Sequence, residues 1–80
     1  MTDKEKQMDT IDLITDEGKI ILITCEFEYV DEAISSIMTY LSSGKTWSPA
    51  LIPGHTRVEY MEMHELRWIN MRRIIGVRSS

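Results

Sequence analysis

The residues most suggestive of binding chemistry lie in one short basic and aromatic segment. This segment reads Arg-Trp-Ile-Asn-Met-Arg-Arg and spans residues 67–73. Aromatic rings can stack on bases and arginines can hold phosphates, as in proteins that bind single-stranded nucleic acids. The candidates for such binding to RNA or DNA are Arg67, Trp68, Arg72 and Arg73. The alternative is that the arginines pair with acidic groups of the same fold, while Trp68 and Ile69 divide between an interface and the core.

The distribution of charge bears on this choice. Residues 1–32 hold ten acidic residues and three lysines, a balance of −7, whereas residues 33–80 hold three glutamates and six basic residues, a balance of +3. The two halves can therefore pair within one fold or between subunits, or the basic half can meet an acidic partner. The sequence pI of about 5.0 argues against a dedicated nucleic-acid binder. Nucleic-acid binding is thus the second hypothesis.

Methionine and tryptophan favour a protein-binding surface. The chain has six methionines and two tryptophans in 80 residues. Methionine adapts to irregular surfaces, and tryptophan is enriched where binding energy concentrates. Trp47 is a further candidate for such a surface, although core packing explains any single one of these residues equally well. The predicted protein-binding residues are Met61, Met63 and Trp68.

The nucleophilic and metal-binding side chains are too few to predict an enzyme. Cys25 lies inside an apolar run beside Glu26, which opposes thiolate formation, so we expect a buried and inert thiol. His64 has Glu62 two residues before it, but a zinc site usually needs three protein ligands. His55 follows a Pro-Gly turn signal and is expected in a loop. The sequence predicts no catalytic residue, no metal and no cofactor.

The first structural elements follow from alternating apolar residues. Residues 1–9 lack apolar periodicity and are expected to form a disordered tail before a single domain, 10–80. Residues 10–15 and 19–28 predict a hairpin in which Gly18 supplies a positive φ. The second strand is apolar on both faces and should be central. Its predicted inner face consists of Ile21, Ile23, Cys25 and Phe27.

A change of period predicts one helix over residues 31–43. Its apolar residues recur at spacings of three and four. Asp31 is the expected N-cap, and Gly44 is the expected left-handed residue after the helix. The helix should pack on the inner face of the central strand. Pro49 and Pro53 then indicate a loop or a short edge strand.

From Thr56 the pattern becomes β-like again but does not keep one alternation. A bulge or turn near His64 would reset the phase, and two strands around a tight Met71–Arg73 turn would form a C-terminal hairpin. The competing interpretation is a helix over Met61–Ile74, because methionine, leucine and charged residues favour helix.

These elements predict an α+β fold with a small, mostly antiparallel sheet in the order β-β-α-β-β and one helix on one face. The helix leaves the opposite face, with Ile20 and Leu22, without a cover. Either the C-terminal strands curl over that face or a second subunit covers it. Because 80 residues build only a small core, the sequence favours self-association as a further source of stability.

The functional expectation is a small, non-enzymatic interaction or regulatory module that acts through protein–protein contacts, as a homodimer or with another protein. No stretch approaches the ~20 apolar residues of a membrane span. The first ten residues are polar and of mixed charge, and the chain has a single cysteine. These features favour a cytoplasmic protein without a membrane partner.

Overall fold

The first two strands form the predicted hairpin. The structure is a computed structural model and describes residues 7–60 and 68–79. Strand β1 (Met8–Thr15) pairs antiparallel with β2 (Ile20–Glu26). The turn between them contains Gly18 at φ +83°, a conformation that an L side chain rarely adopts. Strand β1 begins two residues before the predicted strand.

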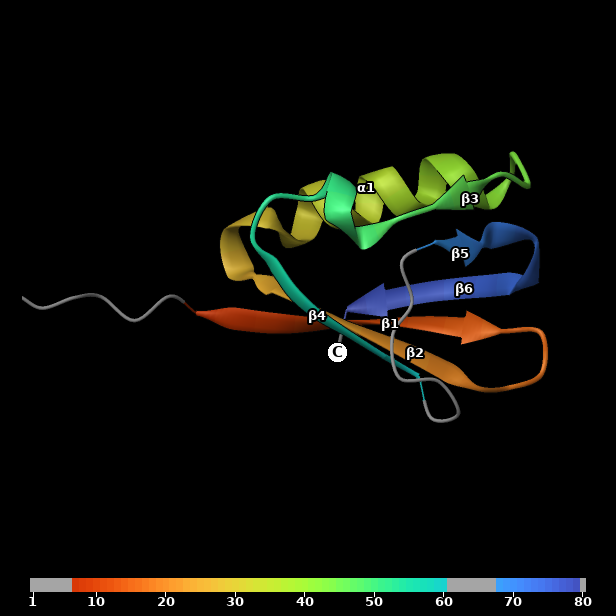
Figure 1. Ribbon diagram of the computed structural model, residues 1–80, viewed down its shortest axis with the longest axis horizontal. Helices are drawn as coiled ribbons and strands as arrows, with labels where there is room; N and C mark the ends of the chain where they lie inside the picture. Colours follow the sequence, from red (N-terminus) through yellow and green to blue (C-terminus); the bar gives the residue numbers. More distant parts are fainter. Residues whose placement is uncertain (1–6, 61–67, 80) are drawn as a thin grey trace, which may run out of the picture.

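Two further strands extend the hairpin into a four-stranded antiparallel sheet. Strand β4 (His55–Tyr60) pairs with β2, and β6 (Ile74–Ser79) pairs with β1, which gives the order β4-β2-β1-β6 (Figure 1). The prediction that β2 is central is therefore confirmed. Strand β1 is central as well.

The helix α1 (Val30–Leu41) corresponds closely to the predicted helix. The expected N-cap is wrong, however. Tyr29 occupies the N-cap without a capping side-chain hydrogen bond, and Asp31 lies in the first turn, where its charge still suits the positive end of the helix dipole. Gly44 has φ +71°, as expected, and its N–H donates to the Tyr40 carbonyl at 3.2 Å.

The core lies between α1 and one face of the sheet. Val30, Ala33 and Ile37 of the helix are buried, and so are the side chains of Ile21, Ile23 and Cys25 in the strand below. The prediction that Phe27 belongs to the inner face is wrong. Strand β2 ends at Glu26, the 3₁₀ helix η1 (Phe27–Tyr29) follows, and the Phe27 side chain is 60% exposed.

The proline-containing connection supplies a second, two-stranded sheet. Strand β3 (Thr46–Trp47) pairs with β5 (Ile69–Asn70), and the 3₁₀ helix η2 (Pro49–Leu51) follows β3. Trp47 is fully buried, and its indole N–H donates to Ser36 Oγ at 2.9 Å. Trp47 is therefore a core residue and not part of a binding surface.

The predicted C-terminal hairpin is not formed by the described residues. The 3₁₀ helix η3 (Met71–Arg73) separates β5 from β6, and the two strands pair with different partners, β3 and β1. Buried Met71 anchors this turn, and Asn70 Oδ1 accepts the Arg72 N–H at 3.1 Å. Residues 69–74 are strand and 3₁₀ helix, so the competing α-helix does not extend over them. The predicted bulge near His64 lies outside the described residues.

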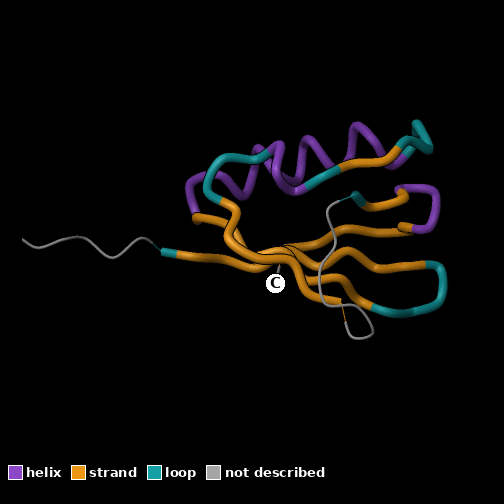
Figure 2. Tube along the Cα trace, viewed as in Figure 1, coloured by secondary structure: helices purple, strands orange, loops and turns teal. Residues whose placement is uncertain are grey.

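The elements are arranged in layers. Helix α1 and the β3–β5 pair lie on one side of the four-stranded sheet, and none of the described elements covers the other side (Figures 1 and 2). Strand β6 extends the sheet at its edge instead of curling over the Ile20 and Leu22 side. Within the described residues, no helix has the length and apolar character needed to cross a bilayer.

Candidate interaction surface

The structure describes only some of the residues predicted to bind a partner. Met61, Met63 and Arg67 lie outside the described residues. Trp68 precedes β5 and is 61% exposed, whereas its neighbour Ile69 is 3% exposed. This division matches the interpretation in which Trp68 faces outward and Ile69 joins the core.

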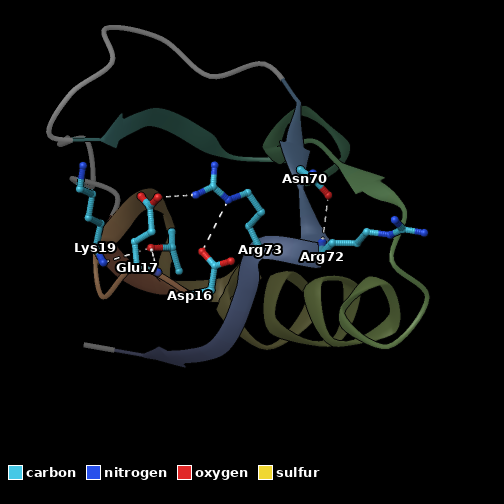
Figure 3. A network of polar contacts seen from close by, with 7 residues as sticks. Asp16, Glu17, Lys19, Asn70, Arg72 and Arg73 are labelled. Carbon is cyan, nitrogen blue, oxygen red and sulfur yellow. Dashed lines mark hydrogen bonds and ion pairs between the residues drawn. The ribbon is translucent and has the colours of Figure 1, made fainter.

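Arg73 is engaged by the acidic turn of the first hairpin. Its Nε lies 3.5 Å from Asp16 Oδ1, and its Nη2 lies 2.8 Å from Glu17 Oε2 (Figure 3). The Asp16 N–H also donates to the Arg73 carbonyl at 2.7 Å. The carboxylates of Glu17 and Asp16 raise the pKa of the Arg73 guanidinium. The charge of Arg73 is therefore already matched within the fold.

Arg72 points the other way. Figure 3 shows the Arg72 side chain extending away from the acidic turn. This side chain lies close to Gly44 instead, because a Cβ added at Gly44 would be 3.3 Å from Arg72 Cγ. Arg72 is exposed and has no acidic partner among the described residues. Of the described arginines predicted to hold phosphates, only Arg72 keeps an unmatched charge.

The uncovered side of the sheet is a second candidate surface, which we call the open face. Side chains alternate along a strand, so the neighbours of the buried inner residues point to it. Cross-strand pairing places Thr10 beside Thr24, Asp12 beside Leu22 and Ile14 beside Ile20. The edge strands add two residues from β4 and two from β6. The open face thus contains Thr10, Asp12, Ile14, Ile20, Leu22, Thr24, Arg57, Glu59, Gly76 and Arg78.

One row of the open face crosses all four strands. Glu59 pairs with Leu22, Leu22 with Asp12, and Asp12 with Arg78. Arg78 Nε donates to Asp12 Oδ2 at 3.0 Å. The Asp12 side chain is only 8% exposed, whereas that of Arg78 is 61% exposed. On the edge strand β4, Glu59 forms an ion pair with Arg57. These four charged groups therefore balance one another.

The described thiol and imidazole side chains, Cys25 and His55, both lie in strands of the sheet. Cys25 is fully buried, as predicted. Burial raises the pKa of its thiol, and the carboxylates of Asp9 and Glu26 raise it further, so the neutral form is favoured. His55 is the first residue of β4 and not a loop residue. His64 and Glu62 lie outside the described residues. Within the described ranges, no three His, Cys, Asp or Glu side chains are grouped so that they could hold a metal ion.

Sequence reasoning missed the Asp12–Arg78 pair and the open face as a charged surface. The two residues are 66 positions apart, so no local spacing signals their contact. The only available signal was the opposite charge of the two halves of the chain. It left open pairing within one fold, pairing between subunits and an acidic partner, and Arg73 and Arg78 show that pairing within the fold occurs.

The comparisons with known proteins add no relative. Searches of protein-family models, curated proteins and solved structures found no match to this chain.

Proposed function

We propose that this chain is a small, non-enzymatic interaction module that works through protein–protein contacts and self-associates. The observation that carries the proposal is the four-stranded sheet with helix α1 on one face and none of the described elements on the other. An antiparallel sheet commonly leaves one face to solvent, but an uncovered face that also holds apolar side chains is suited to a partner. Leu22 is 36% exposed on that face.

The exposed apolar side chains support the same proposal. Trp68 and Ile75 are 61% and 69% exposed. Scattered exposed apolar residues are common, but tryptophan contributes more binding energy than most residues when a partner covers it. Trp68 therefore remains a protein-binding candidate. Met61 and Met63 keep this role as sequence-based predictions only.

Nucleic-acid binding is less well supported. Arg73 and Arg78 are matched by Asp16, Glu17 and Asp12, which leaves Arg72 as the unmatched arginine of the described part of the predicted site. Affinity for nucleic acid depends mainly on the number of phosphates that are neutralised. One unmatched arginine and one exposed tryptophan offer few such contacts.

The module is proposed to work in the cytoplasm. The single cysteine is buried in the core and its thiol is kept neutral. A protein that depends on neither a disulfide nor a reactive thiol is suited to a reducing compartment. Expression in cells with a fluorescent tag, followed by fractionation, tests this location. Recovery in the periplasm or the secreted fraction would contradict it.

Sedimentation over a range of protein concentrations tests self-association. The expected result is a weight-average mass that rises above 9.3 kDa with concentration. A monomer at every concentration up to the high micromolar range would contradict self-association. Fluorescence anisotropy with a labelled single-stranded oligonucleotide tests the other class of partner. Binding that weakens steeply with salt and is lost in Arg72→Ala would favour nucleic acid instead.

A further inference from the structure

We propose that the open face binds the open face of a second copy, with Glu59 of one copy opposite Arg78 of the other. This inference rests on the self-association proposed above and specifies its surface and orientation. Three properties of the face support it: the order of its charges, the position of its apolar residues and its size.

The order of charges selects the orientation. Glu59 lies on the edge strand β4 and Arg78 on the opposite edge strand β6, in one row. Two identical sheets can stack about a two-fold axis that runs along the strands, and this operation places β4 of each copy over β6 of the other. Each Glu59 then meets an Arg78, and symmetry forms the contact twice. A two-fold axis along the row would instead place like charges over each other.

Both charged groups have capacity for a second partner. Arg78 uses Nε for Asp12, and its side chain is still 61% exposed, so its terminal N–H groups can donate to another carboxylate. Glu59 remains 45% exposed beside Arg57. Covering the face in this orientation therefore leaves none of these four charges without an opposite charge, which limits the desolvation cost.

The apolar residues lie where the same orientation brings them together. Ile14 and Ile20 are cross-strand neighbours on the central strands β1 and β2, and both are half-buried. Rotation about an axis along the strands places this pair over its own copy. Leu22 lies next to them, between Glu59 and Asp12. The centre of the interface is thus apolar and its two edges are charged, as in many protein interfaces.

The size of the face sets the strength of the dimer. Four strands about 4.8 Å apart and seven residues at about 3.3 Å cover roughly 20 by 23 Å, or about 450 Å² per copy. Two copies therefore bury roughly 900 Å², near the lower limit of ~1,000 Å² for stable interfaces. The expected dimer is weak and depends on concentration.

Two variants of the open face, each with a matched control, test the inference. Glu59→Lys places a lysine opposite Arg78, and Glu32→Lys makes the same change on an exposed position of α1. Leu22→Gln removes an apolar contact, and Met38→Gln does so on the helix, where Met38 is 57% exposed. Both open-face variants should weaken dimerisation about tenfold or more in sedimentation equilibrium, and both controls should leave it unchanged. Circular dichroism verifies that each variant is folded.

The possible outcomes separate this inference from the proposed function. A wild-type dimer that both open-face variants leave intact would overturn the open-face interface but not self-association. Weakening by Leu22→Gln without an effect of Glu59→Lys would overturn the charge-paired orientation. A wild-type protein that stays monomeric would overturn the inference and the proposed self-association together.

Discussion

Removal of the Arg78 guanidinium should destabilise the fold more than removal of the arginine on the opposite edge strand. Asp12 lies in the central strand β1 with its side chain 8% exposed, and Arg78 Nε donates to it at 3.0 Å. In Arg78→Ala this carboxylate stays largely buried without its counter-charge. Such a loss costs several kcal/mol in a fully buried pair and less than ~1 kcal/mol in an exposed pair.

The geometry places the expected cost between these limits. Because the Arg78 side chain is 61% exposed, water can partly replace it. We therefore expect Arg78→Ala to lower the free energy of unfolding by about 1–2 kcal/mol. In a domain of this size, that corresponds to a fall of roughly 4–16 °C in the melting temperature.

Arg57→Ala is the matched control, because it removes an arginine from the open face whose partner Glu59 is 45% exposed. Its expected cost is below ~0.5 kcal/mol. Urea unfolding at a low protein concentration at which the chain is monomeric, followed by circular dichroism, measures both variants, because Arg78 also lies in the proposed interface and dimerisation would shift the apparent stability. Equal losses in the two variants, or no loss in Arg78→Ala, would contradict a stabilising role of the Arg78–Asp12 pair.

Two further predictions concern the backbone and the core. Gly54 has φ +82°, and an added Cβ would lie 2.7 Å from Tyr29 Cδ2, so Gly54→Ala should lower the free energy of unfolding in urea by about 2 kcal/mol or more. Gly18 has φ +83° with open space around it, so the control Gly18→Ala should cost only ~1 kcal/mol for the backbone conformation. Equal costs in the two variants would contradict a steric clash at Gly54. Burial raises the pKa of the Cys25 thiol above its unfolded value, so its contribution to stability is present at neutral pH and is lost as the pH rises above about 9. The difference in stability between the wild type and Cys25→Ala should therefore shrink between pH 8 and pH 10.5, and a difference that does not change with pH would contradict a raised thiol pKa.

The sequence was sufficient for the elements that depend on nearby residues. The first hairpin follows from alternation and Gly18, and the helix follows from apolar spacing and Gly44; the structure contains both. These features are local, because a turn glycine or a helical stripe needs only residues a few positions away. The same is true of the expectation that Cys25 is buried within an apolar strand.

The elements that depend on distant partners could not be predicted. Strand β6 pairs with β1 and not with its neighbour β5. Buried Trp47 pairs with Ile69 of β5 and donates its indole N–H to Ser36 Oγ, and both contacts join segments that are distant in the sequence. Phe27 has the correct alternation for the core, yet strand β2 ends at Glu26 and η1 begins at Phe27. Alternation of apolar residues predicts which face of the sheet a side chain points to only as far as the strand extends. The open face was foreseen as an uncovered Ile20 and Leu22 side, but its charge order required the strand order.

The most direct test of self-association through the open face is a dilution series followed residue by residue in ¹H–¹⁵N NMR spectra. We expect the amide shifts that change with concentration to cluster on the strands of the open face, with the largest changes near Ile14, Ile20 and Leu22. Changes that cluster around Trp68 and η3 would move the interface to the tryptophan surface. Spectra that do not change from the low to the high micromolar range would contradict self-association itself.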